Sequence, residues 1–250
     1  TKGRTEQPLR IVVGGGPGVG KTTFASRAPG ALICDFERGS GQLDCARVDV
    51  SKMTDVTELI DDLAKDRAAT FQTLVIDSID WLQNVIFEEI KIERRVASLA
   101  EDFGKGYPPA VTKFAKLLTE DLERIRQAGM HVILIAHMSP MQVNDNPALE
   151  SHDRHSLKLY NGSKANPGGT SALIREWADY ILFAAHDTVV KEIGDRGRKR
   201  TMARSSGDRV MFTQGTDTFE AKSRRPMLAR LPLDWDAFWE AHIKAPNWKP

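Results

Sequence analysis

A glycine-rich segment at residues 15–22 constrains this chain more than any other feature. It reads Gly-Gly-Pro-Gly-Val-Gly-Lys-Thr and fits the pattern G-x-x-x-x-G-K-[ST]. An apolar run at residues 11–13 precedes it, and a helix is predicted over residues 21–27. In such a strand–loop–helix unit the backbone N–H groups turn toward phosphate oxygens, and the helix N-terminus favours an anion. The segment therefore predicts nucleotide binding. The alternative, a flexible glycine-rich turn, does not explain the strand and helix that flank it.

The loop also predicts which side chains contact the nucleotide. We expect the Lys21 ammonium to lie at the β- and γ-phosphates and the Thr22 hydroxyl to ligate Mg²⁺. The residues expected to bind the nucleotide are Gly15, Gly16, Pro17, Gly18, Val19, Gly20, Lys21, Thr22 and Thr23.

A second motif ends in an acid about 55 residues after the loop. Residues 73–78 read Thr-Leu-Val-Ile-Asp-Ser, which is typical of a buried parallel strand. The carboxylate of Asp77 would then emerge at the carboxyl edge of the sheet, opposite Thr22. We expect Asp77 to complete the magnesium site there. The alternative is a strand followed by a plain Asp-Ser turn.

Composition limits the remaining possibilities. The chain has 250 residues, 41% of them hydrophobic, with 35 basic and 34 acidic side chains. This length suits one α/β domain with a sizeable core. A net charge of +1 provides no global attraction to nucleic acid. Cys34 and Cys45 form neither a disulfide framework nor a metal-ligand spacing. Without a signal peptide or a long apolar stretch, we expect a soluble intracellular protein with no membrane contact.

Predicted strands and helices alternate along the chain. This order predicts an α/β fold with a mostly parallel central sheet and helices on both faces. Residues 99–109 and 138–171 are rich in turn-forming residues, and we expect irregular, functional loops there. The expected strands are 11–13, 32–36, 73–77, 131–137 and 179–184, and the expected helices are 21–27, 56–64, 80–98 and 111–129. The expected division is a tail at 1–10, a core at 11–235 that includes a basic hairpin at 186–212, and a C-terminal helix and tail at 236–250.

Three motifs together resemble the core ATPase domain of the RecA-like recombinases. Residues 73–82 resemble the second-acid strand of that family, and residues 132–137 resemble the strand that ends in its γ-phosphate sensor. Residues 166–180 resemble the glycine pair and helix that close its second DNA-binding loop. The resemblance covers most of residues 10–235, and the short chain is most similar to phage-encoded single-strand annealing proteins. It implies a RecA-like P-loop fold, ATP and Mg²⁺ as cofactors, and DNA-dependent ATP hydrolysis.

The resemblance also implies catalytic roles. Glu37 matches the glutamate that activates the attacking water, and His137 stands at the γ-phosphate sensor. Lys222 and Arg224 resemble a basic pair that reaches the nucleotide of a neighbouring subunit, which implies a homo-oligomer. The alternatives are a solvated loop acid, a core histidine and a surface basic run.

Two regions are candidates for DNA contact. Residues 191–209 carry seven basic and three acidic side chains, and their glycines favour a hairpin or a mobile loop. Such a patch neutralises phosphates, although a solvated hairpin is the alternative. In the loop after His137, one aromatic residue is placed to stack on a base. The expected DNA-binding residues are Lys158, Tyr160, Lys164, Arg196, Arg198, Lys199 and Arg200.

These features predict a Mg²⁺-dependent ATPase that binds single-stranded DNA and promotes homologous recombination or strand annealing. The expected partners are single-stranded DNA, further copies of the chain and a single-stranded-DNA-binding protein. By resemblance, the expected location is the cytoplasm of a bacterial host. Two alternatives stay open. One is a helicase-like motor or loader of the same fold, and the other is a regulatory ATPase or kinase that does not act on DNA.

Overall fold

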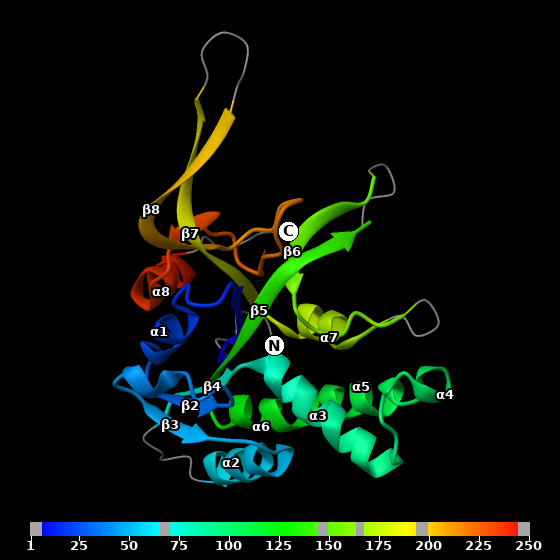
Figure 1. Cartoon of the computed structure of the whole chain (residues 1–250). Helices are drawn as coiled ribbons and strands as arrows, with labels where there is room; N and C mark the ends of the chain where they lie inside the picture. Colours follow the sequence, from blue (N-terminus) through cyan, green and yellow to red (C-terminus); the bar gives the residue numbers. More distant parts are fainter. Residues whose placement is uncertain (1–6, 66–70, 145–149, 164–167, 194–199, 245–250) are drawn as a thin grey trace, which may run out of the picture.

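A central sheet with helices on both faces organises the chain (Figure 1). The computed structural model describes residues 7–65, 71–144, 150–163, 168–193 and 200–244. Along the sheet the strands follow the order β10-β8-β7-β1-β5-β4-β2-β3. The run from β7 to β3 is parallel throughout, whereas β8 and β10 add antiparallel strands at one edge. The α/β fold with a mostly parallel sheet is therefore confirmed.

The elements have the following bounds. The strands are β1 (Arg10–Gly15), β2 (Ala31–Asp35), β3 (Ala46–Asp49), β4 (Thr73–Asp77), β5 (His131–Val143), β6 (His152–Leu157), β7 (Tyr180–Ile193), β8 (Arg200–Phe212), β9 (Lys222–Ser223) and β10 (Arg230–Pro232). The helices are α1 (Lys21–Ser26), α2 (Met53–Lys65), α3 (Ile79–Arg94), α4 (Glu101–Gly104), α5 (Tyr107–Lys116), α6 (Leu122–Gln127), α7 (Thr170–Trp177) and α8 (Trp235–Lys244). A 3₁₀ turn (Ser40–Gln42) follows β2, and a π-helical turn (Leu117–Asp121) joins α5 to α6.

Alternate residues of the central strands supply the two halves of the core. In β1, Val12 packs on the face covered by α2, α3, α5, α6 and α7. Its neighbours Ile11 and Val13 face the other side, where α1 and α8 pack. Because β1 and β5 are buried on both faces, their apolar runs are continuous, as expected of central parallel strands. Because these strands are packed on both faces, their carboxyl ends are held in place, and the candidate site lies there.

Two segments that were expected to be irregular loops contain helices or strands, so those predictions were wrong. Within 99–109 the chain forms α4 and begins α5 at Tyr107, with prolines in the first turn, where a missing N–H costs little. Within 138–171, β5 continues to Val143 and pairs with β6 in antiparallel register, with Met138 opposite Leu157. This ribbon is half-exposed and mostly polar, so hydrophobic periodicity does not reveal it.

Other boundaries differ by smaller amounts. β1 begins at Arg10 and α8 at Trp235, so each expected terminal segment is off by one residue. The helix expected at 80–98 ends at Arg94. β3 was not expected, because its four residues are exposed and carry little apolar pattern. Where a hairpin was expected at 186–212, β7 and β8 pair in antiparallel register and project beyond the sheet (Figure 1), while residues 194–199 lie outside the described part of the chain.

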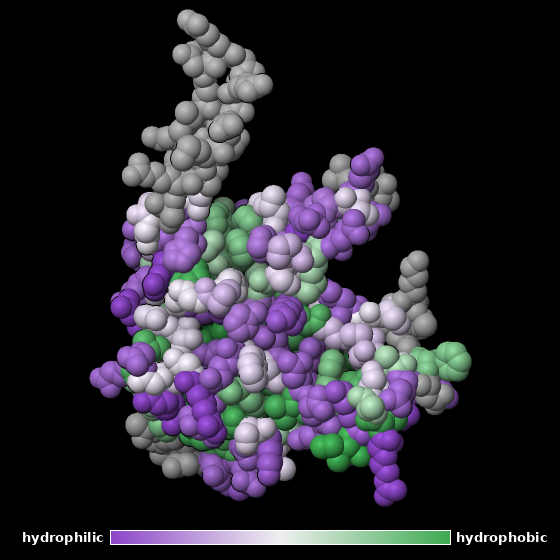
Figure 2. Space-filling view, in the orientation of Figure 1, coloured by the Kyte–Doolittle hydropathy of each residue, from purple (hydrophilic) through white to green (hydrophobic). Residues whose placement is uncertain are grey.

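The surface seen in Figure 2 is largely hydrophilic. Apolar residues are exposed at the α4 end of the helical layer, where the Phe103 side chain is 98% exposed. A search of the described helices finds none with both the length and the apolar character needed to cross a membrane.

Candidate nucleotide-binding site

The glycine-rich loop connects β1 to α1 at the carboxyl edge of the sheet. Gly18 and Gly20 have φ angles of 71° and 101°, which side-chain-bearing residues rarely adopt. Lys21 is buried, and its Nζ donates hydrogen bonds to the carbonyl oxygens of Gly15 (3.2 Å) and Gly16 (2.8 Å). Burial lowers the pKa of Lys21, although nearby carboxylates oppose this shift. The loop is thus curled around one ammonium group at a helix N-terminus.

Thr22 and Asp77 meet at this edge. The Thr22 Oγ1 donates a hydrogen bond to Asp77 Oδ2 at 2.7 Å, across 55 positions of sequence. Burial raises the pKa of Asp77 to about 6, although the Thr22 hydroxyl favours its ionised form. A hydroxyl and a carboxylate side by side are hard oxygen ligands of the kind that Mg²⁺ prefers. These two residues therefore fit a magnesium ion.

The turn after β2 is built around a buried carboxylate. Asp35 accepts hydrogen bonds from the backbone N–H groups of Glu37 (3.1 Å), Gly39 (3.3 Å) and Ser40 (2.9 Å). This turn directs Glu37 toward β4, where its Oε1 accepts a 2.6 Å hydrogen bond from Ser78 Oγ. Glu37 is therefore positioned from both sides, by Asp35 through the backbone and by Ser78 through the side chain.

His137 lies beside Glu37 and is held by an acid that sequence reasoning missed. Asp80 Oδ1 accepts the backbone N–H of His137 at 3.0 Å, and Asp80 Oδ2 lies 2.9 Å from its ring Nδ1. The hydrogen bond to Asp80 raises the pKa of His137. Burial opposes ionisation of Asp80, but the hydrogen bonds from His137 outweigh it and lower the pKa of that carboxyl. The available signal was the position of Asp80, in the first helical turn three residues after Asp77.

These residues form one polar cluster beside Lys21. Ligand atoms of Glu37, Asp80 and His137 all lie within 4.8 Å of one another. The His137 Nδ1 is 3.8 Å from Glu37 Oε1. An unprotonated glutamate can accept a proton from water, and a charged imidazole can donate to an anion. The site thus brings together a phosphate loop, two oxygen ligands, a carboxylate and a histidine.

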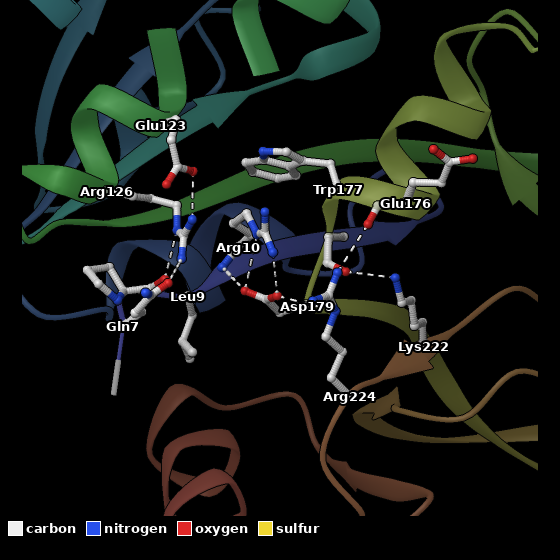
Figure 3. A network of polar contacts seen from close by, with 12 residues as sticks. Gln7, Leu9, Arg10, Glu123, Arg126, Glu176, Trp177, Asp179, Lys222 and Arg224 are labelled. Carbon is white, nitrogen blue, oxygen red and sulfur yellow. Dashed lines mark hydrogen bonds and ion pairs between the residues drawn. The ribbon is translucent and has the colours of Figure 1, made fainter. Parts of the chain in front are cut away.

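Lys222 and Arg224 lie near Asp179 and Arg10 (Figure 3). They are at the start of β7, whereas the P-loop follows the other, carboxyl end of β1. Lys222 Nζ donates to the backbone oxygens of Arg175 (2.6 Å) and Ala178 (2.8 Å), at the end of α7. The Arg224 guanidinium lies 3.4 Å from the Asp179 carboxylate, and its Nη2 donates to the Glu176 carbonyl oxygen in α7 at 3.2 Å. Within this chain both cations stabilise a helix terminus. Their action on a neighbouring subunit stays a prediction.

The expected DNA-binding residues fall into two groups. Tyr160 stacks on Tyr107, with ring centroids 4.4 Å apart and an interplanar angle of 4°, so one face of its ring is already covered. Lys158 is exposed, and its backbone N–H donates to the His137 carbonyl at 2.9 Å. Arg200 begins β8, but its side chain lies outside the described part of the chain. Lys164, Arg196, Arg198 and Lys199 also lie outside the described residues.

Comparison with known proteins identifies the family. A sequence model of the AAA domain matches residues 7–225, which include the loop, Thr22 and Asp77 of the magnesium site and the whole polar cluster. No curated protein matches the chain. Because the match spans most of the sequence and contains every residue of the candidate nucleotide site, the chain belongs to the AAA domain family of P-loop ATPases.

Proposed function

We propose that this protein is a Mg²⁺-dependent ATPase of RecA-like type that binds single-stranded DNA and promotes homologous recombination or strand annealing. The hydrogen bond between Thr22 and Asp77 carries the ATPase part, because it joins the phosphate loop to the second acid. In this proposal the loop holds the phosphates of ATP and Lys21 neutralises their charge. A magnesium ion held by Thr22 and Asp77 would supply further charge neutralisation at the β- and γ-phosphates.

The polar cluster would perform the proton chemistry of hydrolysis. Glu37 orients a water molecule for in-line attack and accepts its proton, while Ser78 keeps the carboxylate in place. Because Asp80 holds Nδ1 of His137, the other ring nitrogen is left to donate to the γ-phosphate. His137 would thereby distinguish a nucleotide that has the γ-phosphate from one that lacks it.

Two features support the DNA part of the proposal. The β7–β8 hairpin projects beyond the sheet, and its sequence is basic. The hydrogen bond from the Lys158 N–H to the His137 carbonyl joins the segment after β6 to the γ-phosphate side of the site. DNA bound along these elements would be coupled to the nucleotide state. The proposal includes a homo-oligomer in which Lys222 and Arg224 act across an interface, a single-stranded-DNA-binding protein as partner, and action in a bacterial cytoplasm.

The test is the steady-state ATPase rate with and without single-stranded DNA at two salt concentrations, with Lys21→Ala as the blank. We expect DNA to stimulate the rate and high salt to reduce this stimulation. Annealing of complementary oligonucleotides, measured in parallel, tests the biological role. ATP-dependent unwinding without annealing would favour a motor or loader. An ATPase rate indifferent to DNA would instead favour a regulatory ATPase and would overturn the DNA part of the proposal.

A further inference from the structure

Arg209 of β8 lies against the phosphate loop. A Cβ atom added to Gly20 would come within 2.8 Å of Arg209 Nη1 and 3.3 Å of its Cδ. The guanidinium therefore covers the α-carbon of the glycine immediately before Lys21. The backbone of Arg209 is fixed by its pairing with His186 and by a 2.9 Å hydrogen bond from Leu233 N–H.

The guanidinium of Arg209 is not neutralised within the described chain. No carboxylate of the described residues forms an ion pair with it. Asp187, on the adjacent strand, is instead paired with Arg230 at 2.5 Å. The Arg209 side chain is exposed, whereas Val210 and Met211 beside it are buried. A fixed strand thus presents a free cation at the edge of the loop.

The loop needs such a cation because its surroundings are acidic. Lys21 is the ammonium of the loop, and the carboxylates of Asp77, Asp80 and Glu37 all act on its charge. A nucleoside triphosphate would add three to four negative charges to this site, roughly, at neutral pH. Arginine suits phosphate because its planar guanidinium can donate two parallel hydrogen bonds.

There is also room for a ligand beside Arg209. A cavity of about 640 Å³ opens next to it, lined by Val210, Leu231 and Pro232 and by the charged residues Asp187, Asp208 and Arg230. This volume is within the usual range for small-molecule sites. The cavity gives the Arg209 side chain open space on one side, while its contact with Gly20 places the guanidinium at the phosphate loop.

We propose that Arg209 is a second phosphate-binding cation of the nucleotide site, delivered by β8 of the same chain. This inference rests on the proposed binding of ATP at the P-loop and adds a residue outside it. Because β8 is one arm of the projecting hairpin, a phosphate held by Arg209 also fixes the base of that hairpin. The ligand is the polyphosphate of a nucleotide, and a DNA phosphate is the competing possibility.

The experiment measures the affinities of fluorescent ATP, ADP and AMP for the full chain and its variants. We expect Arg209→Ala to weaken ATP binding by about tenfold to one-hundredfold, the range for a lost hydrogen bond to a charged group. AMP, which lacks the β- and γ-phosphates, should lose much less. Arg209→Lys should recover part of the affinity, since it retains the charge without the guanidinium geometry. Arg27→Ala is the matched control, because Arg27 is exposed and paired with Asp234.

Three outcomes decide the inference. A selective loss of ATP affinity in Arg209→Ala, with Arg27→Ala unchanged, supports it. Equal ATP affinity in Arg209→Ala and the unmodified chain overturns it, while ATP binding by the unmodified chain would leave the proposed function intact. Unchanged ATP affinity with weaker binding of single-stranded DNA assigns Arg209 to a DNA surface and also overturns it. If the unmodified chain binds no nucleotide, the proposed function itself fails.

Discussion

The side-chain oxygen of Gln83 accepts a hydrogen bond from the backbone N–H of Tyr160 at 2.9 Å. The same oxygen accepts a hydrogen bond from the Thr170 hydroxyl at the start of α7. Gln83 is buried on α3, one helical turn after Asp80, so the two side chains leave the same face of the helix. One rigid helix therefore holds His137 with its first turn and the segment after β6 with its second.

This arrangement predicts that Gln83→Leu separates ATP hydrolysis from its response to DNA. The substitution keeps the side-chain volume but removes the acceptor of Tyr160 and Thr170. We expect the DNA-independent ATPase rate to stay unchanged and its stimulation by single-stranded DNA to be lost. Gln127→Leu, at an exposed position of α6, is the control. Normal stimulation in Gln83→Leu would contradict the coupling role.

Glu37→Gln should abolish hydrolysis while preserving nucleotide binding. The amide keeps the shape of the side chain but cannot accept a proton from water. We expect the turnover rate to fall by about one-hundredfold to ten-thousandfold, the usual contribution of a general base. Rapid-quench measurement of a single turnover, beside fluorescent ATP binding, checks both parts. Glu58→Gln, exposed on α2, should behave like the unmodified chain. Undiminished turnover in Glu37→Gln would remove this residue from the mechanism.

Asp77→Asn should raise the free energy of unfolding and abolish ATP hydrolysis. Burial raises the pKa of Asp77 to about 6, from the roughly 3.9 of an unperturbed aspartate, so the folded state disfavours the ionised carboxylate. The folded state binds more protons than the unfolded state between these values, and stability therefore falls as the pH rises from about 4 to 6. We expect the variant to gain about 1–3 kcal/mol in free energy of unfolding at pH 7, an order-of-magnitude figure.

Urea denaturation at pH 4 and pH 7, without nucleotide or magnesium, measures this effect. The gain should be largest at pH 7 and nearly absent at pH 4, where the native carboxyl is protonated. A variant no more stable than the unmodified chain at pH 7 would show that the buried charge costs little.

Asp80→Asn should shift the pH dependence of the ATPase. The hydrogen bond to Asp80 raises the pKa of His137, so the charged imidazole persists to higher pH than in a free histidine. The stabilising pair is fully formed below the unfolded pKa of histidine and is lost as the pH rises through the raised value. In the variant the alkaline fall of activity should therefore begin at lower pH. An identical alkaline limb in both proteins would exclude His137 as the titrating group.

A mixing experiment tests whether Arg224 acts across an interface. Lys21→Ala cannot use its own loop, and Arg224→Ala cannot supply the guanidinium to a neighbour. If Arg224 acts in trans, each variant is inactive alone, and a mixture recovers part of the activity because some sites combine both intact parts. No recovery, together with a lower melting temperature of Arg224→Ala, would instead assign Arg224 to its contacts with the Glu176 carbonyl in α7 and with Asp179.

Much of the fold could be predicted because its strongest signals are local. The P-loop and the buried strand of Asp77 are contiguous segments whose apolar character reflects burial on both faces of the sheet. Asp80 and Gln83 were harder to find, because each resembles an ordinary helical polar residue until the fold brings His137 or Tyr160 to it. The ribbon of β5 and β6 escaped prediction because its residues are half-exposed.

The length of β7 has a mechanical consequence. Its first residues are held in the sheet against β1, beside the phosphate loop, whereas beyond His186 it pairs with β8 alone. An irregularity in register between His186 and Thr188 marks the change. From there to Ile193 the strand extends about 23 Å at the usual rise per residue. Such a strand works as a lever arm, because a tilt of about 10° at the irregularity moves its far end by about 4 Å. A small tilt of β7 beside the phosphate loop would thus displace the far end of the strand by about the distance between stacked bases.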